Sequence, residues 1–108
     1  MPRRARVTLP HVTHHIIQRG NNRQVCFINE KDRGLFLRWL REYAIETECA
    51  LHAYVLMTNH FHLLVTPTTV NGVGHLMKHL GQRYVQYFNR TYQRTGSLWE
   101  GRFRSCLM

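Results

Sequence analysis

Two apolar segments joined by a two-residue turn constrain the fold of this chain more than any other feature. Residues 50–57 (A-L-H-A-Y-V-L-M) and residues 60–66 (H-F-H-L-L-V-T) each have the length and apolar content of a β-strand. Thr58 and Asn59 between them leave room only for a tight turn, so the two strands should pair antiparallel as a hairpin. We therefore expect a sheet built around this hairpin.

The segments on either side of the hairpin predict two helices and two further strands. Residues 12–19 have a strand pattern that ends at the turn signal Gly20-Asn21-Asn22, and residues 98–107 have another. Apolar residues recur every three or four positions after the candidate N-cap Asn29 and again over residues 70–94. The order β-α-β-β-α-β is the split βαβ arrangement of ferredoxin-like folds. We expect an α+β domain whose antiparallel sheet carries both helices on one face, with the other face open.

The composition of the chain limits the classes of function and partner that it can have. A chain of 108 residues forms one small domain, and its 15 Lys+Arg against 6 Asp+Glu give a formal net charge of +9. This excess favours a polyanionic partner, although a basic but otherwise ordinary surface has the same composition. The three cysteines are far apart and form no C-x-x-C pair, which indicates reduced thiols. With no secretory or membrane-spanning segment, we expect a cytoplasmic protein that does not contact a membrane.

His60 and His62 are the residues of the hairpin most suited to chemistry. Side chains two positions apart on a strand share a face, so the two imidazoles should lie side by side. Phe61, Leu63 and Val65 should face the helices, which places both histidines on the open face. There they could chelate one metal ion, but most histidine pairs are ordinary surface or core residues.

Four segments of the chain, in order, carry a family resemblance. These are H-H-I-I-Q-R-G-N-N-R-Q (14–24), H-A-Y-V-L-M-T-N-H-F-H-L-L-V (52–65), L-G-Q-R-Y-V-Q-Y-F-N-R-T-Y (80–92) and G-S-L-W-E-G-R-F-R-S (96–105). Together they resemble the REP-associated tyrosine transposases, a branch of the single-tyrosine HUH transposases of small bacterial insertion sequences. Phe61 is the hydrophobic residue U of the HUH motif. The resemblance covers nearly the whole chain.

The resemblance implies DNA transposition, in which single-stranded hairpin DNA is cut and rejoined. His60 and His62 would be the catalytic histidines and would hold Mg²⁺ or Mn²⁺ at the scissile phosphate. A tyrosine would attack the phosphorus and stay joined to the 5′ end, and the released 3′ hydroxyl could reverse the step elsewhere. Because Mg²⁺ prefers oxygen ligands, further ligands would have to come from water, DNA or another side chain.

The sequence departs from the family in one respect. The family's nucleophilic tyrosine lies on a later helix, in a segment of the form Tyr-Ile-x-x-Asn-Pro, and residues 1–108 contain no such segment. We therefore expect a transposase HUH domain without that helix, inactive alone. Tyr84 and Tyr87 fall on the apolar stripe of the second helix, and nothing directs Tyr92 at the histidines. The uncovered sheet face, with apolar residues such as Leu64, should promote self-association, for example as a homodimer.

The remaining candidates concern DNA binding. Arg83 and Arg90 lie on the polar side of the second helix, where backbone contact and simple solvation are both open. Arg102 and Arg104 lie beside Trp99 in a mixture of stacking and phosphate-binding groups, although Trp99 could instead pack at the core edge. His14 and His15 alternate, so at most one can approach the histidine pair. Two alternative functions remain: a non-catalytic single-stranded nucleic-acid-binding module, and a metal-binding protein unrelated to DNA.

Overall fold

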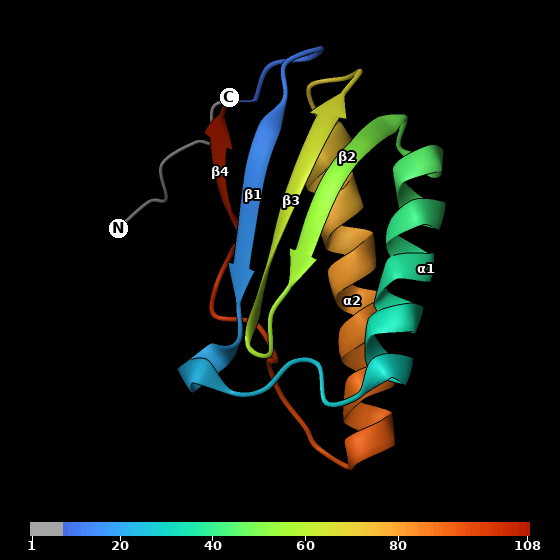
Figure 1. Cartoon of the computed structure of the whole chain (residues 1–108), viewed down its shortest axis with the longest axis vertical. Helices are drawn as coiled ribbons and strands as arrows, with labels where there is room; N and C mark the ends of the chain where they lie inside the picture. Colours follow the sequence, from blue (N-terminus) through green and yellow to red (C-terminus); the bar gives the residue numbers. More distant parts are fainter. Residues whose placement is uncertain (1–7) are drawn as a thin grey trace.

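The computed structural model describes residues 8–108, and its architecture is the predicted one (Figure 1). A four-stranded sheet has the order β2-β3-β1-β4, and each pair of neighbouring strands is antiparallel. Both helices cover one face of the sheet and the other face is open, which confirms the α+β, ferredoxin-like β-α-β-β-α-β class. No helix in the described part is long and apolar enough to cross a membrane. The elements are β1 (His14–Arg19), the 3-10 turn η1 (Asn21–Arg23), α1 (Glu30–Glu46), β2 (Cys49–Leu56), β3 (His60–Pro67), α2 (Gly72–Tyr92) and β4 (Arg104–Leu107).

The β2–β3 hairpin forms as its sequence predicts. The Met57 N–H donates to the His60 carbonyl over 2.8 Å and closes the turn, and Leu56 is then paired with Phe61. Every second side chain of β3, from Phe61 to Pro67, is buried against the helices. This alternation fixes which side chains of β3 face the open side of the sheet.

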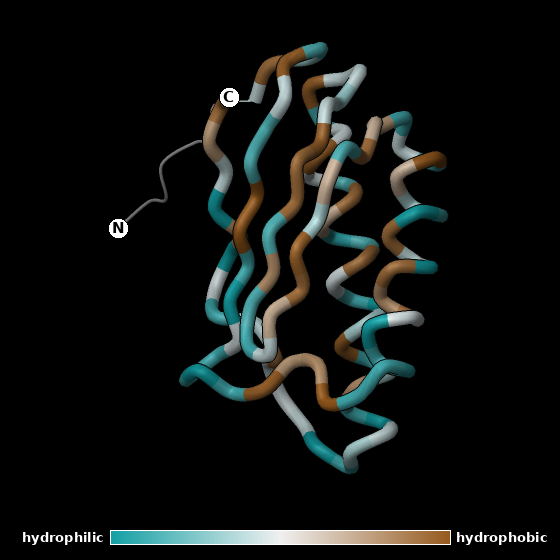
Figure 2. Tube along the Cα trace, in the orientation of Figure 1, coloured by the Kyte–Doolittle hydropathy of each residue, from teal (hydrophilic) through white to brown (hydrophobic). Residues whose placement is uncertain are grey.

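The core lies between the sheet and the two helices. Asn29 caps α1, because its side-chain oxygen accepts a hydrogen bond from the Asp32 N–H over 3.0 Å. On α2 the buried positions recur at helical spacing, so one stripe faces the sheet. In Figure 2 brown segments alternate with teal ones along both helices, whereas the η1 turn is mainly teal. Large and fully buried members of the core are Tyr84, Phe27, Phe36, Phe61, Ile16, Leu40, Leu63, Leu76, Leu80, Leu98 and Val65.

The last strand is shorter than the predicted range 98–107. Only Arg104–Leu107 pairs with β1, and an isolated bridge joins Gly20 to Trp99. Leu98 is fully buried, and the adjacent Trp99 also packs against the core, with its ring centroid 5.4 Å from that of Phe61. Consecutive residues of a strand point to opposite faces, so two adjacent core side chains are incompatible with a regular strand here. Elsewhere the predicted ends differ from the observed ones by one or two residues.

Candidate metal and DNA site

His60 and His62 lie side by side on the open face of the sheet, where the alternation of β3 places them. Phe61, between them, is directed into the core and is 1% exposed, whereas both imidazoles are half-buried. The two ring centroids are 5.1 Å apart and the rings are inclined at 75°. The predicted pair therefore exists as a geometric unit on the face that no helix covers.

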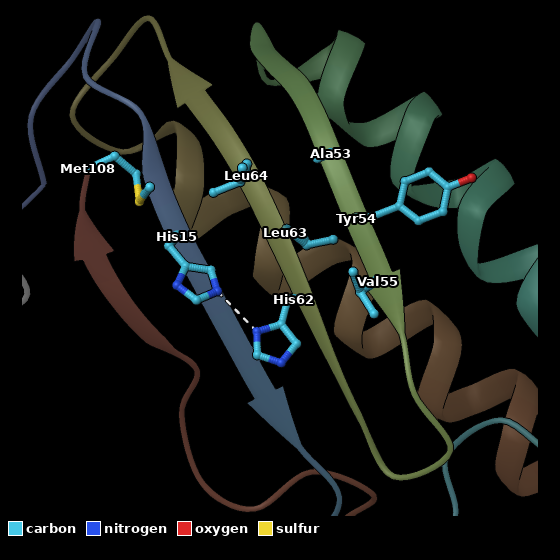
Figure 3. A pocket seen from close by; sticks show the side chains of 8 residues that line it. All are labelled: His15, Ala53, Tyr54, Val55, His62, Leu63, Leu64 and Met108. Carbon is cyan, nitrogen blue, oxygen red and sulfur yellow. Dashed lines mark hydrogen bonds between the residues drawn. The ribbon is translucent and has the colours of Figure 1, made fainter.

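A third imidazole, that of His15, joins this pair from β1. Because β1 residue Ile17 is paired with His62, His15 lies diagonally across from His62. Its Nε2 is 3.0 Å from Nδ1 of His62, and the two rings are inclined by only 14° (Figure 3). His14 points to the opposite face, where it is buried and its Nδ1 is 2.7 Å from the Val12 carbonyl oxygen. Of these two adjacent histidines, only His15 approaches the pair.

His60 has a hydrogen-bond partner of its own. Its Nδ1 is 2.9 Å from Oδ1 of Asn59, the last residue of the hairpin turn. A carboxamide oxygen only accepts, so Nδ1 of His60 carries the hydrogen. The neutral ring then keeps a lone pair on Nε2, the atom left for a ligand.

The surroundings of His62 favour its neutral form. Burial lowers the pKa of His62, and the charges of His60, His15 and Arg19 lower it further. A neutral imidazole is the form that binds a metal ion. His62 is therefore suited to be a ligand rather than a surface cation.

The pair could supply two imidazole ligands to a metal ion. Within residues 8–108, no group of three or more His, Cys, Asp or Glu side chains is arranged to hold a metal ion. Two imidazole nitrogens fit Mn²⁺ or a later divalent metal better than Mg²⁺, and a phosphate oxygen or water would have to complete the coordination. The donor set therefore suits an ion shared with a bound phosphate.

The four predicted DNA-contacting arginines lie in two places. Arg104 is paired with Ile17, so its side chain shares the open face with the histidines, and Arg102 is exposed just before β4. Arg83 and Arg90 are on α2, in the helix layer. Arg83 is already engaged: its guanidinium lies 4.7 Å from the centroid of the Trp39 ring, and its Nη1 is 3.5 Å from Glu42.

Two further arginines, which the sequence reasoning did not assign, border the histidine pair. Arg19 and Arg23 line a hollow of about 460 Å³ together with Asn59, His60 and Glu100. Both arginines are exposed, and within the described residues neither makes an ion pair with a carboxylate. The position of Arg19 could have been predicted from the sequence, because strand alternation places it on the same face as His15. The position of Arg23 could not be predicted in this way, because it depends on left-handed backbone at Asn22 and Arg23.

None of the five tyrosines, all of which are in the described part, points its hydroxyl at the histidine pair. Tyr84 is fully buried and donates to the Cys26 carbonyl over 2.6 Å. Tyr87 and Tyr92 both donate to the Asp32 carboxylate on the helix side. Tyr54 is in β2, and its side chain directs the hydroxyl away from His62 (Figure 3), while Tyr43 packs against His79.

The fold and the His-x-His pair on its open face have the layout of the HUH proteins, the class that the sequence resembles. The family described as "Transposase IS200 like" matches residues 8–108, and the chain therefore belongs to the IS200-like transposases. This family membership implies DNA transposition and the processing of single-stranded DNA. No curated protein matches the chain at a significant level.

Several solved structures share the fold. One, from Deinococcus radiodurans R1 and assigned as a transposase, has a TM-score of 0.72 at 22% identity, covering 99% of this chain and 86% of that one. Another is a REP-associated tyrosine transposase bound to a REP hairpin, with a TM-score of 0.71 at 13% identity. That match covers 100% of this chain and 62% of the other, so the present chain spans less than two thirds of its length.

Proposed function

We propose that this protein binds single-stranded hairpin DNA on the open face of its sheet, with His60 and His62 holding a divalent metal ion, Mg²⁺ or Mn²⁺, at the scissile phosphate. The observation that carries the proposal is the position of the two imidazoles, side by side on a basic and uncovered surface. The family and the hairpin-bound structural relative support the choice of DNA. When bound, the metal would polarise the phosphate and favour attack at phosphorus.

The arginines around the pair would hold the DNA backbone. Arg19 and Arg23 border the hollow that contains His60, and Arg104 lies on the same face across β1. Their guanidinium groups can each donate two hydrogen bonds to a phosphate. Arg102 would extend this path along the edge of the sheet.

Arg83 and Arg90 would serve a different part of the DNA. They are in the helix layer, so they could reach only a duplex stem that extends around the edge of the domain. Because Arg83 already contacts Trp39 and Glu42, we expect its contribution to be the smaller of the two.

The strand-transfer step needs a nucleophile that this arrangement does not provide. In that step a tyrosine oxygen bonds to phosphorus while the P–O3′ bond breaks, which leaves a 5′ phosphotyrosine and a free 3′ hydroxyl. The tyrosine hydroxyls described above donate to buried acceptors or point elsewhere. We therefore propose that these 108 residues are a transposase HUH domain that, alone, binds DNA and metal without cutting.

The lack of a tyrosine hydroxyl directed at the histidine pair among the described residues favours a second candidate function, a non-catalytic single-stranded DNA-binding module. In that case the basic open face would be used without any metal. The two functions differ in whether the histidine pair binds a metal ion, which can be measured directly.

The uncovered face also suggests self-association. Beside His15 and His62 it has an apolar hollow of about 330 Å³, which Val55, Leu64 and Met108 help to line. Pairing two such surfaces would remove apolar area from water. We propose a homodimer through this face, in a protein of the cytoplasm, where its three free thiols would stay reduced.

The test combines metal binding and DNA binding. Mn²⁺ affinity, followed by electron paramagnetic resonance, is expected to fall at least tenfold in His60→Ala and in His62→Ala. It should be unchanged in His52→Ala, a matched control on the same face whose Nε2 bonds Thr66 instead. Unchanged Mn²⁺ affinity in both site variants would contradict the metal site and favour the non-catalytic module.

DNA binding is measured with a labelled single-stranded hairpin at increasing salt. Each of Arg19→Gln and Arg23→Gln should lower the slope of log K against log salt by about 0.7, the value for one lost phosphate contact on a single strand. Arg38→Gln on α1, where Arg38 pairs with Glu42, is the control. A protein-linked DNA product that Tyr92→Phe abolishes would contradict the absence of a nucleophile.

A further inference from the structure

We propose that His15 and Asn59 are positioning residues, which fix the tautomers of His62 and His60 so that both rings keep the Nε2 lone pair for the metal. This inference rests on the proposed function, in which His60 and His62 are the ligands. Neither positioning residue would touch the ion.

The contact between His15 and His62 has the geometry of a hydrogen bond in the plane of the rings. Nε2 of His15 and Nδ1 of His62 are 3.0 Å apart, and the two ring planes differ by 14°. The N–H bond and the lone pair of an imidazole both lie in the ring plane, so nearly coplanar rings align donor with acceptor. One nitrogen must carry the hydrogen and the other must accept it.

The identity of the donor follows from the ligand role. A neutral imidazole has one N–H, so a ring that offers Nε2 to a metal must carry its hydrogen on Nδ1. Nδ1 of His62 then donates to Nε2 of His15, and His15 carries its own hydrogen on Nδ1. Metal-binding histidines in proteins usually donate their second N–H to a fixed acceptor in this way.

Asn59 accepts a hydrogen bond from Nδ1 of His60, just as His15 accepts one from Nδ1 of His62. Its Oδ1, 2.9 Å from Nδ1 of His60, can only accept a hydrogen bond. The tautomer of His60 is thereby set, again with the lone pair on Nε2. Both candidate ligands are thus held by an acceptor at Nδ1.

The backbone holds the two acceptors rigidly. His15 is within β1, the strand that pairs with both β3 and β4. Asn59 is in the hairpin turn, where its carbonyl accepts from the Gly20 N–H over 2.8 Å and ties the turn to the end of β1. Positions fixed by sheet pairing are suited to orient a ligand.

The test compares two side chains of similar length at position 15. His15→Gln brings a carboxamide oxygen near the place of Nε2 and can still accept from His62, whereas His15→Met fills similar space without a strong acceptor. The tautomers are read from ¹⁵N chemical shifts of the histidine rings in metal-free protein at about pH 8, above the ordinary histidine pKa. Mn²⁺ affinity and the melting temperature are measured on the same samples.

We expect the Nδ1–H form of His62 in the wild type and in His15→Gln. In His15→Met the Nε2–H form, which an unpartnered imidazole prefers, should grow, and Mn²⁺ affinity should fall about 10- to 100-fold. His52→Met, on the same face, should change neither. Asn59→Asp should preserve the His60 tautomer, whereas Asn59→Leu should not.

Two outcomes would overturn the inference. One is an Nε2–H tautomer of His62 in the metal-free wild type, and the other is an unchanged tautomer and Mn²⁺ affinity in His15→Met. Failure of the proposed function is a separate result, seen as Mn²⁺ affinity that does not depend on His60. The tautomer of His62 is measured without metal and therefore decides the role of His15 by itself.

Discussion

The buried carboxylate of Asp32 binds the hydroxyls of both Tyr87 and Tyr92. This carboxylate is fully buried and accepts from the Tyr87 hydroxyl over 2.5 Å and from the Tyr92 hydroxyl over 2.7 Å. The Ile28 N–H, at 2.9 Å, is another donor. Burial alone would raise the pKa of Asp32, but these hydrogen bonds outweigh it and hold the pKa below its usual range. In return, burial and the bond to Asp32 raise the pKa of Tyr92 to about 12, which makes it a poor nucleophile.

Replacing Asp32 with Asn should therefore destabilise the protein by about 2–4 kcal/mol at neutral pH, because charge-assisted bonds are lost around a buried group. The folded pKa lies below the unfolded value of about 3.9, so the unfolded state takes up the proton first. The contribution of Asp32 to the free energy of unfolding is complete above the unfolded pKa and is lost as the pH falls through the folded pKa. Urea unfolding at several pH values should show the wild type and Asp32→Asn converging in acid; a constant difference would contradict this account.

At the scale of elements, the end of β1 is packed tightly against the residues that follow the η1 turn. A Cβ added to Gly20 would lie 2.5 Å from the Gln24 carbonyl oxygen and 2.7 Å from Sγ of Cys26. The same residue is hydrogen-bonded to Asn59. The backbone that carries Arg19 and Arg23 therefore passes through a point where only glycine fits.

Gly20→Ala should cost about 1–3 kcal/mol, since overpacking shifts the surrounding backbone. It should also weaken hairpin DNA binding, because the hollow bordered by Arg19 and Arg23 would be displaced. Gly34→Ala on α1 is the matched control: its Cβ would meet no atom within 4 Å, and alanine favours a helix by about 0.5–1 kcal/mol. Thermal unfolding and DNA titration of both variants check this; equal stability of the two would refute it.

Much of this element-level structure could be predicted from the sequence. Local periodicity was sufficient for the hairpin, the helices and the shared face of His60 and His62, because each is a property of neighbouring residues. The short β4 could not be predicted, since Leu98 and Trp99 are held by tertiary packing. The contact between His15 and His62 likewise depends on the register of β1 against β3, and register is not encoded within either strand.

At the scale of the whole molecule, a basic open face coexists with exposed apolar side chains. Val55 is 50% exposed and Met57 is 47% exposed, both on the edge strand β2 or next to it. Like charges oppose the pairing of two such faces at low salt, whereas the apolar area favours it.

Self-association should therefore strengthen as salt is raised, the reverse of the salt effect on DNA binding. Light scattering at high protein concentration is expected to show dimers that Val55→Lys disperses. Ile45→Lys, at an exposed position on α1, serves as the control. A wild type that remains monomeric in high salt would count against the dimer.

The position of β1 in the sheet has a consequence for when the site comes into being. The residues that bond within the site, His15 and His62, are 47 positions apart along the chain. The β2–β3 hairpin can close early because its contacts are local, whereas His15 reaches it only after the longer loop between β1 and β3 has closed, at a higher cost in chain entropy. Formation of the His15–His62 bond should consequently report a late stage of folding, and the histidine pair on an isolated hairpin would still lack its orienting partner.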